Sequence, residues 1–200
     1  MSASIFYFDF ASPNAYFAHR VLPGIESRTG ATFTYLPVLL GGLFKLTGNQ
    51  APMVAFAGIP AKLAYEHREI IRFIDRHGLT KFVMNPHFPV NSLLAMRGAV
   101  AADERGLLAP YVEALFSAMW EDGVNCADPA ALADVLTAAN LPAEALLNAT
   151  QDEGVKAGLI ANTQAAADCG AFGLPSFLVG KELYFGKDRL GEVERAIVEH

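Results

Sequence analysis

The most constraining feature of the sequence is that strand-like segments occur only near its two ends. Ile5 to Phe10 is a run of β-branched and aromatic residues with almost no polar content, typical of a strand that is buried on both faces. Residues 31–36 alternate small or polar with apolar side chains and indicate a second strand. Residues 13–28 between them have a helical pattern that Gly30 ends. Two strands joined by one helix predict a βαβ unit with parallel strands.

The middle of the chain shows no strand pattern for more than a hundred residues. Residues 41–58 contain glycines, one proline and the turn Thr47-Gly48-Asn49, and we expect them to form a loop. Helices are predicted after that loop, several of them opened by a capping residue or ended by glycine. They cover residues 60–77, a stretch from a cap at Asn91 or Ser92 to Arg105, residues 109–120, residues 129–139, a short piece from Pro142, and a last one opened by the capping box Thr150-Gln-Asp-Glu153 and continuing to Asp168.

Strand patterns return at residues 176–179 and 182–185, on either side of the hairpin turn Gly180-Lys181. Asp188 is expected to cap a final helix. Without the helical block, the order of elements is βαβ–ββα, which is the arrangement of the thioredoxin fold. We therefore predict an α/β, thioredoxin-like domain from residues 1–40 and 170–200, with a large all-helical insertion domain, residues 41–169, between the second and third strands.

Composition excludes several classes of function. The chain of 200 residues is 52% hydrophobic and 18% charged, which is enough to bury a large core. Its net charge is −6 and it has no basic cluster, so nucleic-acid binding is not expected. No apolar stretch approaches the length of a membrane span, and no basic region precedes the first apolar run. These features favour a soluble cytoplasmic protein without a signal peptide and without membrane association.

Neither the cysteines nor the histidines form a recognised motif. Cys126 and Cys169 are far apart and make no Cys-x-x-Cys, so a structural disulfide is not expected in a reducing compartment. Cys169 is expected to be a small buried residue. The five histidines have no metal-ligand spacing, and no Gly-x-Ser-x-Gly occurs, so neither a metal site nor a serine hydrolase is predicted.

Two places in the predicted fold carry residues that suggest chemistry. Ser12 is placed as the N-cap of the first helix, in a Ser12-Pro13-Asn14-Ala15 segment where a redox member of the fold has Cys-x-x-Cys. Gly173-Leu174-Pro175-Ser176 precedes the third strand, where the fold places a cis-proline. A chain without the two cysteines cannot run a dithiol cycle there, so any thiol must come with a ligand, and glutathione is the obvious carrier. The alternative interpretation is that Ser12 only caps the helix.

Short segments along the whole chain resemble one family. The chain is similar to the 2-hydroxychromene-2-carboxylate isomerases, a group shared with kappa-class glutathione transferases. The similarity rests on the order of these segments: Phe8 to Pro13 with Tyr16, Thr47-Gly48-Asn49, Pro60 with Lys62 and Tyr65, Phe88-Pro89-Val90-Asn91, Phe172-Gly173-Leu174-Pro175, and Phe185-Gly186 with Asp188-Arg189-Leu190.

The resemblance implies a glutathione site. Ser12 is the residue that would stabilise the glutathione thiolate, and Leu174, before a cis Pro175, would pair with the cysteinyl backbone of glutathione. Asp188 would bind the ammonium of the γ-glutamyl group. Lys187 stands where kappa-class chains often have serine, and it would pair with the γ-glutamyl carboxylate.

The resemblance also places residues of the insertion near the substrate. Asn49 and Lys62 would lie on the insertion side of the cleft, with Lys62 facing a carboxylate of glutathione or of an aromatic acid. Tyr65 and Asn91 are candidates for the aromatic end of the substrate. The segment between Asn49 and Lys62 is longer than usual for the family. The match to the family at Asn49 and Lys62 is therefore less close than the match at Ser12.

The implied activity is glutathione-dependent conversion of 2-hydroxychromene-2-carboxylate to trans-o-hydroxybenzylidenepyruvate, in aromatic-hydrocarbon breakdown. Thiolate addition turns a double bond into a single bond, which rotates before the thiolate is eliminated. The alternatives are a kappa-class transferase or peroxidase, and a non-catalytic peptide binder that lost the cysteines. The family also suggests a homodimer.

Overall fold

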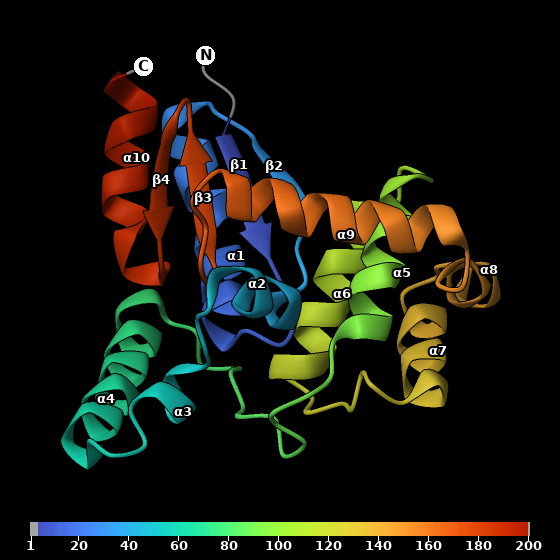
Figure 1. The fold of residues 1–200 in the computed structure, drawn as a ribbon, viewed down its shortest axis with the longest axis horizontal. Helices are drawn as coiled ribbons and strands as arrows, with labels where there is room; N and C mark the ends of the chain where they lie inside the picture. Colours follow the sequence, from blue (N-terminus) through green and yellow to red (C-terminus); the bar gives the residue numbers. More distant parts are fainter. Residues whose placement is uncertain (1–3, 200) are drawn as a thin grey trace.

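The computed structural model describes residues 4–199, and its centre is a mixed four-stranded sheet (Figure 1). The strands lie in the order β2-β1-β3-β4; β1 pairs in parallel with β2 and antiparallel with β3, and β4 pairs antiparallel with β3. The predicted βαβ–ββα arrangement of a thioredoxin-like fold is thereby confirmed. The elements are β1 Ser4–Phe8, α1 Pro13–Thr29, β2 Phe33–Pro37, β3 Ser176–Val179 and β4 Glu182–Phe185.

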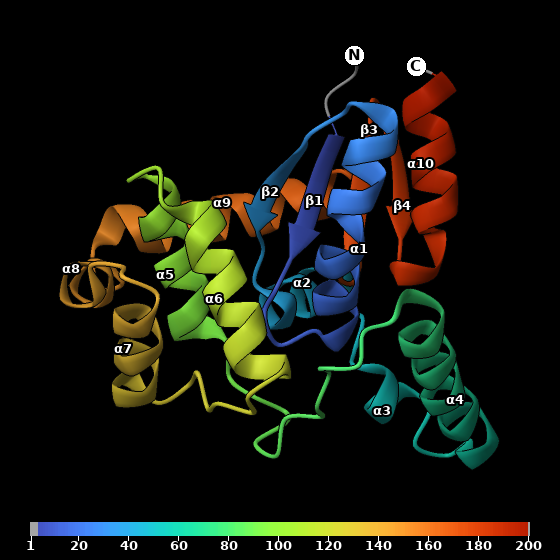
Figure 2. The same cartoon turned by 180° about the vertical axis from the view of Figure 1, so that it is seen from behind.

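Helices cover both faces of the sheet. Figure 1 shows α2 and α9 on the near face, and Figure 2, turned by half a revolution, shows α1 and α10 on the other. The helices after β2 are α2 Leu40–Thr47, α3 Pro52–Ala55, α4 Pro60–His77, α5 Leu93–Asp103, α6 Leu108–Trp120, α7 Pro129–Ala138, α8 Ala143–Ala149 and α9 Glu153–Asp168; after β4 come the 3-10 turn η1 Lys187–Arg189 and α10 Leu190–Glu199.

Strand β1 alternates between two cores because successive side chains point to opposite faces. Phe6 and Phe8 are fully buried in the larger core, which contains α1 and residues of helices α5 to α9. Tyr7 is buried in a smaller cluster with Leu43 of α2 and Ala166 of α9. A strand buried on both sides explains the continuous apolar run in the sequence.

Helices α5 to α9 share the larger core with the sheet. The ring of Phe10 packs edge-on against that of Phe116 on α6, with 4.9 Å between centroids. Nε1 of Trp120, at the end of α6, donates a hydrogen bond of 2.8 Å to the carbonyl oxygen of Phe10. Helix α6 thus contacts the turn that leads into α1. The division into two domains at residues 40 and 170 stays a prediction.

The expected loop at residues 41–58 is wrong, because this stretch forms α2 and α3. Helix α2 forms despite two glycines because Leu43 is fully buried and the Leu40 amide donates a hydrogen bond to the Asp9 carboxylate. Gly42 lies close to α9: a Cβ atom there would be 3.3 Å from Cγ2 of Thr163. This glycine therefore permits close packing of two helices rather than marking a turn.

Three local expectations are also corrected. The Thr150 hydroxyl bonds back to the carbonyl of Leu147, and α9 starts later, with Asp152 at its N-cap position, so no capping box forms. Asp188 lies inside η1 and does not cap α10, which starts at Leu190. Cys169 is exposed at the C-terminal end of α9 rather than buried.

Helices α3 and α4 project from one corner of the molecule, as both views show (Figures 1 and 2). Of the 18 residues of α4, only Phe73, near its C-terminal end, is buried. The N-terminal half of α4 therefore extends away from the core. Within residues 4–199, no helix is both long enough and apolar enough to cross a membrane.

Candidate functional site at the start of α1

Ser12 caps α1 and joins the two ends of the chain. Its backbone is extended (φ −94°, ψ 111°), and its Oγ accepts a hydrogen bond of 3.2 Å from the Ala15 amide. The same hydroxyl donates a hydrogen bond of 3.0 Å to the carbonyl oxygen of Leu174. The predicted cap is confirmed, and Ser12 and Leu174 lie together as the fold requires.

The first turn of α1 leaves one backbone donor free. Pro13 has no N–H, and the amides of Ala15 and Tyr16 both donate to the carbonyl oxygen of Ser12. Among residues 4–199 the Asn14 amide has no hydrogen-bond partner. Since a helix N-terminus carries partial positive charge, this N–H and the Ser12 hydroxyl together favour an anion beside them.

Asp9 fixes the turn that presents Ser12. Its buried carboxylate accepts hydrogen bonds from the amides of Ala11 (2.8 Å) and Leu40 (2.7 Å) and from the hydroxyl of Ser92 (3.0 Å). Burial raises the pKa of the Asp9 carboxyl, and the hydrogen bonds from Leu40, Ala11 and Ser92 act in the opposite direction. One side chain thus ties the start of α2 and the start of α5 to the loop before α1.

A cis peptide bond and two hydrogen bonds fix the segment that contains Leu174. The peptide bond between Leu174 and Pro175 is cis, as predicted. The Ser176 hydroxyl donates to the Gly173 carbonyl (2.7 Å), and the amide side chain of Asn49 donates to the carbonyl of Phe172 (2.7 Å). Asn49 therefore does lie beside the Leu174 segment. The N–H of Leu174 has no hydrogen-bond partner within residues 4–199 and can serve a ligand.

Lys187 and Asp188 lie together but bind one another. The ammonium of Lys187 is 2.9 Å and 3.1 Å from the two carboxylate oxygens of Asp188. Lys187 is only 4% exposed, and its Nζ lies 5.2 Å from the ring centroid of Phe73 on α4, whereas the Asp188 side chain is 57% exposed. The pair offers both charges that the zwitterionic end of an amino acid needs.

Lys62 and Tyr65 lie on the projecting half of α4. Nζ of Lys62 is 3.3 Å from the ring centroid of Phe56, which follows α3, a cation–π contact. Tyr65 is 54% exposed. No contact among the described residues joins either side chain to Ser12 or Leu174, so their predicted roles remain predictions.

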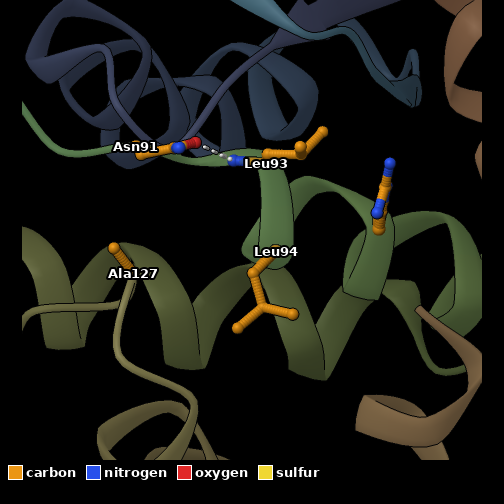
Figure 3. Close-up of a pocket in the computed structure, with 5 residues that line it drawn as sticks. Asn91, Leu93, Leu94 and Ala127 are labelled. Carbon is orange, nitrogen blue, oxygen red and sulfur yellow. Dashed lines mark hydrogen bonds between the residues drawn. The ribbon is translucent and has the colours of Figure 1, made fainter. Parts of the chain in front are cut away.

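Asn91 lines a different hollow. Its side-chain oxygen accepts a hydrogen bond of 3.0 Å from the amide of Leu93. With Leu93, Leu94, Arg97 and Ala127 it borders a cavity of about 180 Å³ at the start of α5 (Figure 3). None of the other predicted site residues lines this cavity, although the next residue along the chain, Ser92, binds Asp9. The structure therefore brings together Ser12, Leu174, Pro175 and Asn49, and separately Lys187 and Asp188.

A second polar cluster joins α1 to α6. Nε2 of His19 lies 3.0 Å from one carboxylate oxygen of Glu113, and Arg20 donates to the other (2.6 Å) and to Glu121 (2.6 Å). The hydrogen bond with His19, together with that from Arg20, lowers the pKa of Glu113 to about 2 against the opposing effect of burial. The hydroxyl of Tyr16, which the sequence similarity includes, also binds Glu121 (3.0 Å). Tyr16 thus belongs to the interface between the two helices.

Sequence reasoning missed Asp9 and Ser92. The available signal was a single carboxylate, Asp9, inside an otherwise apolar run. A buried carboxylate needs several donors, and these come from segments 31 and 83 residues away. Within residues 4–199, no three His, Cys, Asp or Glu side chains are grouped so that they could hold a metal ion.

Comparison with known proteins identifies the family of the chain. The model of the DSBA-like thioredoxin domain matches residues 5–198. The chain belongs to this family. At the start of α1 this chain has Ser12-Pro13-Asn14-Ala15, a segment without cysteine.

Similar proteins include two kinds of enzyme. The chain is 26% identical to a 2-hydroxychromene-2-carboxylate isomerase of Pseudomonas putida over 194 residues, which covers 96% of this chain and 92% of that protein. It is 29% identical to glutathione S-transferase kappa 1 of Rattus norvegicus over 197 residues, covering 92% and 85%. A solved 2-hydroxychromene-2-carboxylate isomerase superposes with a TM-score of 0.85 at 25% identity, covering 98% and 95%. The resemblance inferred from the sequence is therefore confirmed.

Proposed function

We propose that the protein is a glutathione-dependent isomerase that converts 2-hydroxychromene-2-carboxylate to trans-o-hydroxybenzylidenepyruvate. The observation that carries the proposal is the position of the Ser12 hydroxyl, at the start of α1 and against the Leu174 carbonyl. It agrees with the named activity of the similar isomerases, which the chain matches over nearly its whole length.

The residues at this site fit glutathione. Leu174 has an N–H without a partner, which suits an extended peptide backbone. Ser12 and the Asn14 amide suit a thiolate. Lys187 and Asp188 suit the carboxylate and the ammonium of a γ-glutamyl group. Glutathione, when bound, supplies the thiol whose reversible addition to a conjugated double bond permits rotation about that bond.

The chain's own residues hold and orient the reactants. Ser12 donates a hydrogen bond to the sulfur and, with the helix N-terminus, lowers the pKa of the thiol. Lys62, an exposed residue of α4, binds the carboxylate of the aromatic acid, and Asn49 holds the Leu174 segment in place. The resemblance alone assigns Tyr65 and Asn91 to the aromatic end of the substrate.

An absorbance assay tests the proposal. Purified protein is mixed with 2-hydroxychromene-2-carboxylate, with and without glutathione, and Ser12→Ala is measured in parallel. We expect isomerisation that requires glutathione and falls about 10- to 100-fold in Ser12→Ala, since a hydrogen bond to a charged group contributes about 1.5–3 kcal/mol. Isomerisation that is independent of glutathione, or unchanged in Ser12→Ala, would contradict it.

A kappa-type glutathione transferase is the second candidate, favoured by the 29% identity to the rat kappa protein. The two candidates share the glutathione residues and differ in the reaction that follows. Conjugation of glutathione to a general aromatic electrophile, without isomerisation of the chromene carboxylate, would identify the transferase.

A further inference from the structure

Asn14 carries an amide side chain that the fold leaves unused. No hydrogen bond joins either end of this amide to another residue within 4–199, and its Oδ1 is shielded from solvent without a partner. A buried acceptor without a donor costs about 1–3 kcal/mol, so such an atom calls for an explanation. The second residue of α1 is therefore a candidate for binding a ligand that brings a donor.

The position of Asn14 on α1 indicates which part of a ligand it meets. Residues three and four apart lie on one face of a helix, so Asn14 shares a face with Phe17 and Ala18. The ring of Phe17 lies 5.7 Å from that of Phe73 on α4, and the same Phe73 ring lies under the ammonium of Lys187. Helix α1 also packs against η1, which contains Lys187 and Asp188. Asn14 thus lies two residues after Ser12, on the face of α1 whose Phe17 contacts the ring of Phe73 beside Lys187.

We propose that Asn14 is a specificity-determining residue that binds the α-ammonium of the γ-glutamyl group of glutathione, together with Asp188. This inference rests on the proposed use of glutathione. A carboxamide oxygen is an acceptor that suits an ammonium. Asp188 shares its carboxylate with Lys187, so a second acceptor is needed to satisfy the three N–H donors of an ammonium.

The arrangement separates the three charged or polar parts of the ligand. The sulfur meets Ser12, the peptide backbone meets Leu174, and the zwitterionic end meets Lys187, Asp188 and Asn14. A thiol that lacks the α-ammonium would leave the Asn14 oxygen without a donor, and such a loss discriminates strongly between ligands.

Calorimetric titration with two thioethers tests the proposal without any turnover. The ligands are S-methylglutathione and S-methyl-glutaryl-cysteinylglycine, which differ only by the α-ammonium. Neither has a thiol, so the thiolate role of Ser12 does not enter. We expect Asn14→Ala to weaken S-methylglutathione about tenfold and the glutaryl ligand less than twofold, and Asn14→Asp, which keeps acceptor oxygens, to retain the affinity for S-methylglutathione.

Asn162→Ala is the matched control, because Asn162 is also a half-buried helical asparagine whose side chain makes no hydrogen bond within residues 4–199. Equal weakening of both ligands by Asn14→Ala, or of neither, would overturn the role of Asn14 and would leave the isomerase proposal standing. Failure of the wild-type protein to bind S-methylglutathione would overturn both, and binding without isomerisation would reject only the proposed reaction.

Discussion

The hydroxyl of Ser12 donates a 3.0 Å hydrogen bond to the carbonyl oxygen of Leu174, which lies 162 residues further along the chain. A serine hydroxyl has one hydrogen to donate, so Ser12 binds a ligand sulfur only when this hydrogen turns away from Leu174. The Leu174 carbonyl is then left to accept an N–H from the peptide backbone of the ligand. In the proposed complex, binding of the glutathione sulfur and binding of its backbone are therefore coupled through one hydrogen atom.

The thiol pKa of bound glutathione should depend on the Ser12 hydroxyl. We expect the thiol pKa of glutathione in the complex to lie below that of free glutathione, and to rise by about 1–2 pH units in Ser12→Ala, because a charge-assisted hydrogen bond is lost. The ultraviolet absorbance of the thiolate, followed against pH, measures it. Ser12→Thr keeps the hydroxyl and should restore the low pKa; a thiol pKa that is equal in wild type and Ser12→Ala would assign Ser12 to capping alone.

Replacement of Asp9 should loosen the whole site. In Asp9→Asn, the single side-chain oxygen cannot serve Ala11, Leu40 and Ser92 together, so we expect the free energy of unfolding to fall by about 1–3 kcal/mol. Urea denaturation followed by circular dichroism measures the loss, with the exposed Asp134→Asn as the control. An unchanged midpoint in Asp9→Asn would show that these hydrogen bonds contribute nothing net.

Glu113 should make stability depend on pH in the acid range. Its pKa in the folded protein is lowered to about 2 from 4.5, so the folded state binds this proton less readily than the unfolded chain. The contribution is therefore complete above the unfolded value of 4.5 and is lost as the pH falls towards 2. Because the Glu113 side chain is 56% exposed, solvent screening keeps the effect small.

Comparison of variants isolates this contribution. Urea midpoints measured from pH 5 downwards should fall less steeply in Glu113→Gln than in wild type, whereas the exposed Glu104→Gln should follow wild type. Parallel curves for all three proteins would exclude Glu113 as a source of the acid sensitivity.

A methyl group at position 173 should disturb the Leu174 segment. A Cβ atom on Gly173 would lie 2.7 Å from the ring of Phe185, closer than van der Waals contact allows. We expect Gly173→Ala to weaken S-methylglutathione about tenfold in calorimetry, because the displaced backbone carries the Leu174 N–H. The double variant with Phe185→Ala removes the obstructing ring and should recover most of the affinity; no recovery would trace the loss to another cause.

The two thiols should react very differently. Cys169 is exposed, whereas Cys126 is buried and its burial raises the pKa of its thiol to about 12. A colorimetric disulfide reagent should therefore modify one thiol per native chain at neutral pH and two in denaturant. Cys169→Ser should leave the native protein unreactive, and rapid reaction in that variant would contradict the burial of Cys126.

The fold was predictable because its signals are local and agree with its topology. The apolar run from Ile5 to Phe10, the cap at Ser12 and the hairpin at Gly180-Lys181 each specify one element, and the βαβ–ββα order then permits few arrangements. Ser12 and Leu174 were placed together by this order alone.

Features that depend on distant partners were not predictable. The sequence predicts a loop at α2 because its glycines are poor helix formers, and only burial of Leu43 and the hydrogen bond that the Leu40 amide donates to Asp9 compensate. The ion pair between Lys187 and Asp188, and the idle amide of Asn14, depend on how α1, α4 and η1 pack. No periodicity or spacing reports such contacts.

The pairing of β1 with β3 also sets a time order on synthesis. Ser4 in β1 lies opposite Val179 in β3, so the first strand made must wait for almost the last. A growing chain can form α1 and β2 early, but it has no Leu174 to accept from Ser12 until the C-terminal strands leave the ribosome. A chain that ends before β3 therefore lacks both the Leu174 carbonyl that accepts from Ser12 and the ring of Phe177, which stacks on Phe6 with 5.3 Å between centroids.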